Sequence, residues 1–261
     1  MFLTMAPLAK AQNARVWNNK QCAVVLTYDD AIDADLDNAV PALDSMDLKG
    51  TFYLIGSSSV IYKRLDEWRL AAKHGHELGN HTLFHPCDGS LPGRNWITPE
   101  DDLSKYTVAR AVNETRVTNT LLKAIDGKDE RTFAYPCGDL TIGGQLFYNQ
   151  LKNDFVAARG VTPGMQTIDK VDLDNIDCYG INGQPADYMI NLVKQAMQTH
   201  TLLVFLFHGV GGGHNINVSL EAHSRLLHFL KAHEKEIWIA PMVTVAKHVS
   251  EYQEANGVRV K

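Results

Sequence analysis

The sequence predicts an α/β fold in which a parallel sheet is either closed into a barrel or doubly wound. Short apolar runs rich in strand-forming residues alternate with helical stretches along most of the chain. Most of these runs are continuously apolar, which is typical of parallel strands buried on both faces. The chain has 261 residues, no internal repeat and no linker rich in proline, glycine or serine. A single domain is therefore expected.

Eight segments are predicted to be strands, because each is a short, mostly apolar run. They are Ala23–Thr27, Thr51–Ile55, Glu77–Asn80, Thr132–Tyr135, Asp154–Ala158, Asn175–Tyr179, Leu202–Phe207 and Glu236–Ala240. The predicted helices are Leu65–Lys73, Pro99–Ile125, Ala186–Thr199 and Ser219–His233. The second of these is placed by Thr98 as an N-cap, followed by a proline and an acidic first turn. The polar segment Pro86–Ile97 is predicted to be a long loop that forms a lid or a substrate wall.

The composition argues against several functional classes. There are 25 Lys and Arg residues against 30 Asp and Glu, which gives a net charge of −5, and 45% of the residues are hydrophobic. These ordinary values exclude a disordered or fibrous chain. Without a long basic run, neither a nucleic acid nor an anionic membrane surface is an expected partner. The longest strongly apolar stretch, Leu202–Phe207, is far shorter than the ~20 residues of a membrane span.

The N-terminal segment has some features of an export signal. Met1–Leu8 is mostly apolar, and Ala9-Lys10-Ala11 has the small-x-small form of a cleavage site, although no basic region precedes it. We interpret residues 1–20 as an N-terminal segment, either the remnant of an export signal or an ordinary chain end. Residues 21–250 are then the barrel and residues 251–261 a C-terminal tail. The expected location is periplasmic or secreted, with cytoplasmic as the alternative.

The cysteines show no metal or redox spacing. No CxxC pair occurs, so neither a zinc knuckle nor a thioredoxin motif is present. Most of the four are expected to be free buried thiols, although an even number in an exported protein permits disulfides. They are Cys22, Cys87, Cys137 and Cys178.

Polar residues follow several predicted strands directly. In a parallel barrel the C-terminal ends of the strands form one face, where catalytic groups collect. Convergence of unconnected segments on that face is stronger support for a site than any single motif. These residues are Asp29, Asp30, His81, His85, Tyr135 to Asp139, and His208.

The histidine pair and the aspartate pair suggest a metal site. His81 and His85 are four residues apart, which on a helical turn puts both imidazoles on one side at a separation that suits a metal. Thr82 is placed to orient one ring through a hydrogen bond. Asp29 and Asp30 point in different directions, so one can bind the metal while the other acts as a base. The alternatives are unrelated surface histidines and an aspartate that caps a following helix.

His208 ends an apolar strand and precedes the glycine-rich stretch Gly209–His214. Glycines permit close approach of backbone or ligand. Such a histidine is either a satisfied core residue or a general acid that protonates a leaving group. No Lys-Ser or Lys-Thr follows the glycines, so the stretch is not a phosphate loop.

Four motifs together resemble those of the polysaccharide deacetylases, the NodB-homology enzymes of carbohydrate esterase family 4. The motifs are Thr27-Tyr28-Asp29-Asp30, His81-Thr82-Leu83-Phe84-His85, Phe133-Ala134-Tyr135-Pro136-Cys137-Gly138 and Phe205-Leu206-Phe207-His208-Gly209. The resemblance spans roughly residues 21–250. It implies a distorted parallel (β/α) barrel of seven or eight strands in one domain, with a divalent metal. The metal is expected to be zinc, with cobalt or nickel as alternatives.

The resemblance also implies a role for each matching residue. By position, the metal ligands would be Asp30, His81 and His85. Asp29 would be the general base and His208 the general acid. The backbone N–H of Cys137 would donate to the oxyanion.

The chain departs from the family pattern in its third and fourth motifs. Many members carry an arginine in the third motif that pairs with the catalytic aspartate, where this chain has Ala134 or Tyr135. Strand alternation directs Arg131 to the opposite face, so Arg159, at the end of the next predicted strand, is predicted to be the partner of Asp29. For the fourth motif, whose aspartate tunes the acid histidine, the two candidates are Asp174 and Asp177.

The resemblance implies a metal-dependent hydrolase whose partner is an acetylated carbohydrate. It would remove N-acetyl groups from chitin oligomers or peptidoglycan, or O-acetyl groups from a xylan-like polysaccharide. Trp96 and Tyr135 are placed to stack on a sugar ring. Two histidines and a carboxylate also form the facial triad of non-haem Fe(II) enzymes, although those normally have antiparallel barrels. A non-catalytic carbohydrate-binding protein on the same fold is the other alternative. The sequence does not indicate the oligomeric state.

Overall fold

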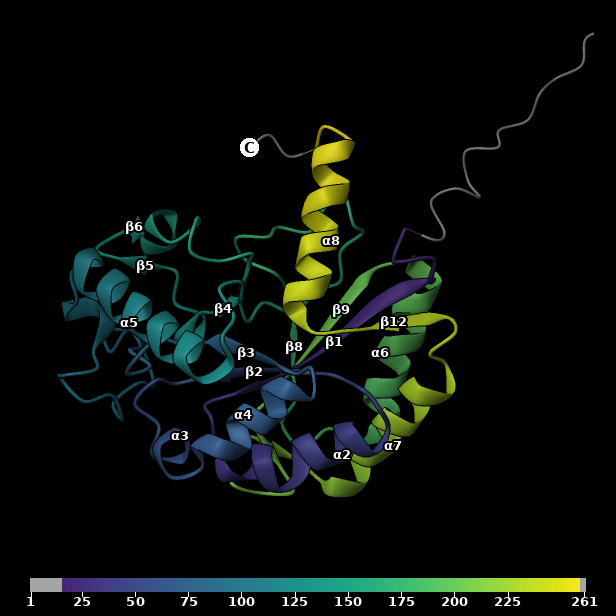
Figure 1. Ribbon diagram of the computed structural model, residues 1–261. Coiled ribbons are helices and arrows are strands. Elements are labelled where there is room, and N and C mark those ends of the chain that lie inside the picture. Colours follow the sequence, from purple (N-terminus) through teal and green to yellow (C-terminus); the bar gives the residue numbers. More distant parts are fainter. Residues whose placement is uncertain (1–15, 259–261) are drawn as a thin grey trace, which may run out of the picture.

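The computed structural model describes residues 16–258, and its centre is a curled parallel sheet (Figure 1). The strand order is β7-β4-β3-β2-β1-β9-β8, and β12 also pairs with β1. The strands are β1 (Cys22–Asp29), β2 (Thr51–Leu54), β3 (Glu77–Asn80), β4 (Phe133–Ala134), β7 (Ala158–Arg159), β8 (Tyr179–Gly180), β9 (Leu202–Phe207) and β12 (Ile237–Ile239). All of these pairs are parallel. The predicted class, a distorted parallel (β/α) barrel, is confirmed.

The two edges of the sheet come together where β7 ends. A parallel bridge joins Arg159 to Ile176, in the segment that leads into β8 at the other edge. The backbone N–H groups of Ile176 and Gly160 donate across this seam to Ala158 and Ile176, at 2.8 and 2.9 Å. The curl therefore gathers the C-terminal ends of distant strands around one opening.

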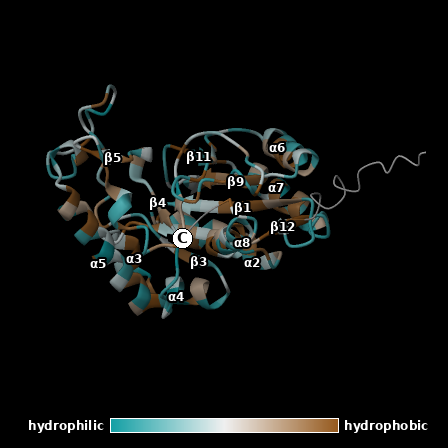
Figure 2. Ribbon diagram, turned by 90° about the horizontal axis from the view of Figure 1, so that it is seen from above, coloured by the Kyte–Doolittle hydropathy of each residue, from teal (hydrophilic) through white to brown (hydrophobic). Residues whose placement is uncertain are grey.

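Helices cover the outside of the sheet. They are α2 (Val40–Ser45), α3 (Ser59–Lys63), α4 (Leu65–Lys73), α5 (Val108–Asp126), α6 (Ala186–Thr199), α7 (Leu220–Ala232) and α8 (Met242–Ala255). A π-helical stretch, Asp35–Ala39, leads into α2. Hydrophobic residues concentrate in the central strands, whereas the outer loops are largely hydrophilic (Figure 2). Two pairs of short strands lie outside the main sheet: β5 (Thr141–Ile142) with β6 (Gln145–Leu146), and β10 (Gly209–Val210) with β11 (Asn217–Val218).

Three predicted helices agree with α4, α6 and α7, but the helix predicted from Pro99 begins at Val108. The N-cap is Thr107, whose hydroxyl accepts a hydrogen bond from the backbone N–H of Arg110 at 3.1 Å. The side chain of Asp102 accepts hydrogen bonds from the N–H groups of Gly89 and Ser104, so the preceding segment belongs to the loop. A capping signature at Thr98 was therefore misleading.

The C-terminal boundary also differs, because α8 continues through residue 250 to Ala255. Gln253, near its end, is buried and donates hydrogen bonds of 2.9 Å to the carbonyl groups of Ile168 and Val171. At the other end of the chain, the expected signal remnant falls mostly in residues 1–15, which lie outside the described residues. Trp17 is fully buried, and its indole N–H donates to the backbone carbonyl oxygen of His200 at 2.8 Å.

Two of the four cysteines form a disulfide. Cys87 and Cys137, 50 residues apart in sequence, have Cα atoms 5.8 Å apart and join the long loop to the end of β4. Cys22 and Cys178 are free and buried. The expectation of free thiols is therefore wrong for the first pair, because folding brings together residues whose spacing gave no sign of contact.

A buried carboxylate holds the N-terminal ends of the strands together. Glu77, at the start of β3, is 3% exposed and accepts hydrogen bonds from Thr51, Thr132 and the backbone N–H of Val243. These residues belong to β2, to the segment before β4 and to α8. Glu77 therefore links three segments at the end of the barrel opposite the candidate site.

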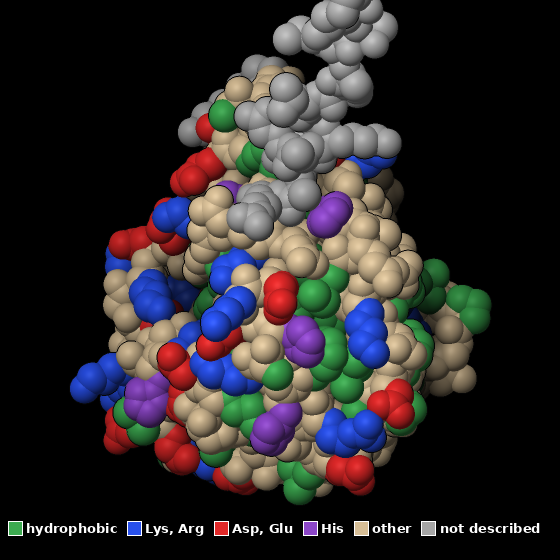
Figure 3. Space-filling model, turned by 90° about the vertical axis from the view of Figure 1, so that its right-hand side faces the viewer, with side chains coloured by type: hydrophobic (Ala, Val, Ile, Leu, Met, Phe, Trp, Pro, Cys, Tyr) green, Lys and Arg blue, Asp and Glu red, His purple; other side chains and the backbone are tan. Residues whose placement is uncertain are grey.

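The surface seen from the side of α6, α7 and β12 mixes charges of both signs (Figure 3). Lys and Arg side chains alternate with Asp and Glu side chains there, with several histidines between them. Within residues 16–258, no helix is both long enough and apolar enough to span a bilayer.

Candidate active site

The C-terminal ends of the strands surround a pocket of ≈ 770 Å³. Asp29 is the last residue of β1, and the register places it beside Tyr53 of β2. His81 directly follows β3, and His208 directly follows β9. The pocket is lined by the following predicted site residues: Asp29, Asp30, His81, His85, Trp96, Tyr135, Cys137 and His208. Arg159 lies behind Asp29, fully buried.

The segment from His81 to His85 is a loop, so the predicted helical turn is wrong. Thr82 and His85 have left-handed φ angles of 64° and 55°. The hydroxyl of Thr82 accepts a hydrogen bond from the backbone N–H of His85 at 2.9 Å, so Thr82 shapes the loop and does not orient a ring. The two rings still meet, with centroids 4.7 Å apart.

Asp30, His81 and His85 offer three ligand atoms within 4.8 Å of one another. Asp30 Oδ1 lies 3.6 Å from His81 Nε2 and 3.7 Å from His85 Nε2. This oxygen is buried and has no hydrogen-bond partner among the described residues. An orphaned carboxylate oxygen facing two imidazole nitrogens fits a divalent cation such as zinc.

The protonation of the histidines suits this arrangement. His81 Nδ1 donates to the carbonyl oxygen of Ala134 at 2.9 Å, which leaves the lone pair on Nε2, the atom that faces Asp30. Burial lowers the pKa of His81 to about 3 and also lowers the pKa of His85. Both rings are therefore neutral near pH 7, as metal ligands must be. The nearby sulfurs of Cys87 and Cys137 are joined in the disulfide and are not available as thiolate ligands.

Asp29 is paired with Arg159. Arg159 Nη2 donates to Asp29 Oδ2 at 2.5 Å, within the reach that the predicted partnership requires. Burial raises the pKa of Asp29. The charge of Arg159, with smaller contributions from His81 and His208, lowers the pKa by more in total, so the net shift is downward. Asp29 Oδ1 is buried and has no hydrogen-bond partner among the described residues. The carboxylate is thus ionised with one free oxygen.

Arg131, the arginine nearest to the third motif in sequence, contacts other residues than this pair. It donates to the carbonyl oxygen of Leu78 and forms an ion pair with buried Asp126. The predicted opposite orientation of Arg131 is confirmed.

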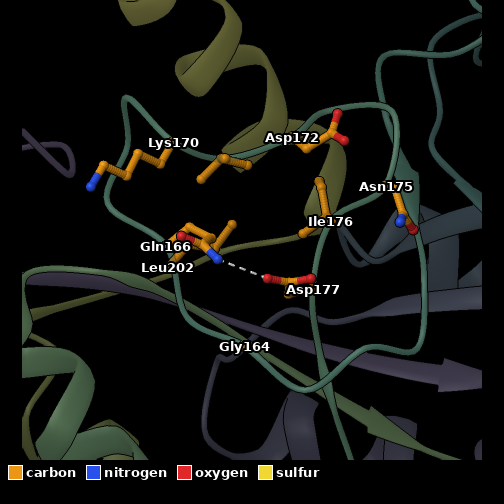
Figure 4. A pocket seen from close by; sticks show the side chains of 9 residues that line it. Gly164, Gln166, Lys170, Asp172, Asn175, Ile176, Asp177 and Leu202 are labelled. Atoms are coloured by element: carbon orange, nitrogen blue, oxygen red, sulfur yellow. Dashed lines mark hydrogen bonds between the residues drawn. The ribbon is translucent and has the colours of Figure 1, made fainter.

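His208 faces the pocket, and no carboxylate of residues 16–258 contacts its Nδ1. Its Nε2 lies 3.9 Å from Asp30 Oδ2, and its Nδ1 is buried without a hydrogen-bond partner among the described residues. Burial lowers its pKa. Neither fourth-motif candidate fills this position: Asp177 accepts a hydrogen bond from Gln166 at 3.0 Å (Figure 4), and Asp174 pairs with Lys152. The loop that carries both aspartates runs along the seam of the sheet instead.

The two aromatic residues predicted to bind substrate differ in exposure. Trp96 lies in the long loop and is 65% exposed at the pocket. Tyr135 is only 3% exposed, its hydroxyl donates to the carbonyl oxygen of Asp174, and its ring packs on Phe147 and Tyr148. Tyr135 therefore has little free surface for stacking on a sugar, because it belongs to a buried aromatic cluster.

Cys137 lies in the short turn Pro136–Gly138 with a left-handed φ of 54°. The long loop is attached to this turn twice, through the Cys87–Cys137 disulfide and through Arg94. The guanidinium of Arg94 pairs with Asp139 and donates to the carbonyl oxygen of Cys137 at 3.4 Å. These contacts hold the loop that carries Trp96 against the pocket.

Sequence reasoning missed part of the pocket wall. His214, Asn215 and Ile216 line it from the loop between β10 and β11, and Val161 lines it from the segment after β7. The signal was the run of glycines after His208, which lets this loop fold back sharply. A side chain at Gly209 would meet the carbonyl oxygen of Gly212 at 2.2 Å.

Comparison with known proteins identifies the family. The family model described as polysaccharide deacetylase matches residues 18–155. The chain therefore belongs to the polysaccharide deacetylase family. The protein YlxY of Bacillus subtilis, described as uncharacterized, is 26% identical over 137 residues, which cover 52% of this chain. The chain spans about a third, 35%, of the length of that relative.

Solved structures share the fold over most of the chain. A variant of the peptidoglycan deacetylase PdaC from Bacillus subtilis superposes with a TM-score of 0.55 at 16% identity and covers 92% of this chain and 96% of that one. The polysaccharide deacetylase Bc1974 from Bacillus cereus has a TM-score of 0.52 at 21% identity, with 84% and 91% covered. At these identities the likeness shows a common fold.

Proposed function

We propose that this protein is a metal-dependent deacetylase that removes acetyl groups from a carbohydrate. One observation carries the proposal: the Asp29–Arg159 pair lies beside the cluster of Asp30, His81 and His85 in a single pocket. Family membership supports it, because the matched residues 18–155 include Asp29, Asp30, His81 and His85.

The residues divide the chemistry among them. A divalent cation held by Asp30, His81 and His85 would supply a Lewis acid at this point of the pocket. Asp29, kept ionised by Arg159, is placed to accept a proton from water through its free Oδ1. His208, in its protonated form, is proposed to give a proton to the leaving nitrogen or oxygen; the charges of Asp29 and Asp30 oppose the lowering of its pKa by burial. The backbone N–H of Cys137 is proposed to donate to the developing oxyanion.

The proposed substrates are N-acetylated chitin oligomers or peptidoglycan, or O-acetylated xylan-like polysaccharides. The pocket volume of ≈ 770 Å³ is enough for a sugar unit, and the exposed ring of Trp96 borders it. The test is acetate release from each of these substrates after reconstitution with zinc or cobalt. Release from one substrate class would support the proposal and name the substrate. No release from any of them would contradict it.

Two other functions remain to be separated by the same experiment. A non-haem Fe(II) enzyme would use the same two histidines and carboxylate, but would need Fe(II) and oxygen for turnover. The parallel sheet, and the presence of Asp29 and His208, argue against it. A non-catalytic carbohydrate-binding protein would bind the sugars and release no acetate with any metal.

We also propose that the protein is exported to the periplasm or secreted. The Cys87–Cys137 disulfide supports this, because disulfides persist mainly in oxidising compartments. Fractionation of the native host, with mass spectrometry to detect the cross-linked peptides, tests it. Recovery only from the cytoplasm with both thiols reduced would contradict it.

A further inference from the structure

His214 is a pocket residue to which the proposed chemistry assigns no role. It lies in the glycine-rich loop between β10 and β11, and its ring stacks on His208 with centroids 4.9 Å apart and planes 15° apart. His214 Nε2 lies 3.8 Å from Asp30 Oδ2. One third of the side chain, 33%, is exposed, so the ring borders the open pocket.

The backbone of Ile216 indicates which nitrogen of His214 carries the hydrogen. The N–H of Ile216 points at His214 Nδ1 at 3.0 Å, whereas the carbonyl oxygen of Ile216 is farther from Nδ1, at 3.3 Å. A hydrogen on Nδ1 would face the nearer N–H, so we assign the lone pair to Nδ1. The neutral ring must then carry its hydrogen on Nε2. This is the reverse of His81, whose Nδ1 donates and whose Nε2 is free. His214 therefore presents a donor to the pocket where His81 presents a lone pair.

We propose that His214 binds substrate by donating its Nε2–H to a sugar oxygen next to the atom that carries the acetyl group. The inference rests on the proposed function, because it takes an acetylated carbohydrate as the ligand. The Nε2 atoms of His208 and His214 both lie within 3.9 Å of the same oxygen of Asp30. A group protonated by His208 therefore has the His214 donor close beside it.

This arrangement suits a carbohydrate more than a simple acetyl compound. A sugar carries oxygens on the carbons adjacent to an acetamido or acetoxy group, and one of these can accept the second donor. A small ester or amide without such an oxygen leaves His214 unused. A site with such a donor selects substrates that carry the acceptor oxygen, because a substrate without it leaves the donor unpaired.

Two substitutions separate the donor from the stacking ring. His214→Phe keeps an aromatic ring against His208 but removes the N–H. His214→Gln removes the ring but keeps an amide donor near the position of Nε2. His228→Phe is the matched control, because His228 is an exposed histidine of α7 that does not line the pocket. All are compared with the unmodified protein after zinc reconstitution.

The primary measurement is binding by calorimetry, not turnover. The probes are a deacetylated β-1,4-glucosamine trimer and β-1,4-xylotetraose. We expect His214→Phe to weaken binding of the preferred probe about three- to tenfold, the usual contribution of one hydrogen bond. His214→Gln should stay within about twofold, and zinc content should be unchanged in both. In the acetate assay the effect of His214→Phe should appear mainly in KM.

Several outcomes would overturn the inference. Full binding by His214→Phe with weak binding by His214→Gln would show that the ring matters and the donor does not. Loss of zinc in either variant would make His214 a ligand. Binding of neither probe by the unmodified protein would leave the donor without its ligand and also count against it. Normal sugar binding with this pattern, but no acetate release, would contradict the proposed function and leave this inference standing.

Discussion

Arg159 Nη2 lies 2.5 Å from Asp29 Oδ2, although the two residues are 130 positions apart in the sequence. Arg159 ends β7 and Asp29 ends β1, and both side chains are almost completely buried. A second nitrogen of the guanidinium donates to the carbonyl oxygen of Gly160 at 2.9 Å, which fixes its direction. Arg159 of β7 thus contacts Asp29, whereas Ala134, in the third motif, has no charged side chain.

Arg159→Ala should lower activity and change its pH dependence. Burial alone would raise the pKa of Asp29, and Arg159 is the largest influence that opposes it. Without Arg159, the acidic limb of the kcat/KM profile should move to higher pH. Loss of one partner of a buried pair also typically costs ~3–5 kcal/mol of stability. Arg159→Lys, which keeps a charge, should shift the limb less. An unchanged acidic limb in a folded Arg159→Ala protein would show that Asp29 does not depend on this arginine.

The two neighbouring aspartates should fail in different ways. Asp29→Asn should keep the metal and lose about 10²–10⁴-fold in kcat, because an amide cannot accept the proton. Asp30→Asn should lose metal, since it removes the charged oxygen that faces both histidines. Metal analysis after dialysis, alongside acetate release, distinguishes them. Equal metal content and equal residual activity would contradict the assignment of separate roles.

Removal of either histidine of the cluster should weaken metal binding. His81→Ala and His85→Ala each delete one of the three candidate ligand atoms, and an alanine side chain offers no atom that can bind a metal. We expect substoichiometric zinc after dialysis in both, and full zinc in an exposed control, His228→Ala. Stoichiometric zinc in His81→Ala would require a different set of ligands.

Acidification should destabilise the fold partly through His223. This histidine shares a hydrogen bond of 2.8 Å with the hydroxyl of Tyr28, and burial lowers its pKa to about 4. An unfolded histidine titrates near pH 6.5, so between pH 6.5 and 4 the unfolded state binds a proton that the folded state does not. The free energy of unfolding should therefore fall as the pH falls through this window, by up to ~1.4 kcal/mol per pH unit from this residue.

His223→Gln removes that titration and should flatten the slope. Denaturant unfolding of both proteins between pH 7 and pH 4.5 measures it, with His228→Gln as the exposed control. Other buried histidines, including His76 with a pKa of about 4, will still contribute to the remaining slope. Parallel curves for the native protein and His223→Gln would exclude His223 as a source of acid sensitivity.

The disulfide should stabilise both the fold and the loop that carries His85. Replacing Cys87 and Cys137 by Ala removes a cross-link between residues 50 positions apart. For a loop of this length the chain-entropy model gives a loss of about 4 kcal/mol in the free energy of unfolding. We expect a lower melting temperature and weaker zinc binding, because His85 lies two residues before Cys87. A reductant should lower the melting temperature of the native protein but not of the double variant. Equal melting temperatures of the two oxidised proteins would contradict this prediction.

The sheet and the line of polar residues at its edge could be predicted because each depends on local pattern. Continuous apolar runs fix the buried strands, and residues just after them must lie at the same edge of a parallel sheet. Helix starts were harder, because the capping signature at Thr98 and the true cap at Thr107 have similar local chemistry. Only the hydrogen bonds of Asp102 decide between them.

The parts of the site that escaped prediction depend on distance in space. No repeating pattern in the sequence indicates that Cys87 pairs with Cys137 or that His214 stacks on His208. The shape of the histidine loop comes from left-handed residues that are not glycine, which propensity does not anticipate. Asp174 and Asp177 interact with Lys152 and Gln166 and not with His208 Nδ1, because their loop runs along the seam of the sheet.

Glu77 joins β2, β3 and α8 at the end of the barrel away from the pocket. The Glu77 hydrogen bonds and the residues proposed to act on substrate therefore lie at opposite ends of the same strands. The exposed loops at the pocket end that make no contact with Glu77 can therefore vary while this set of hydrogen bonds is kept.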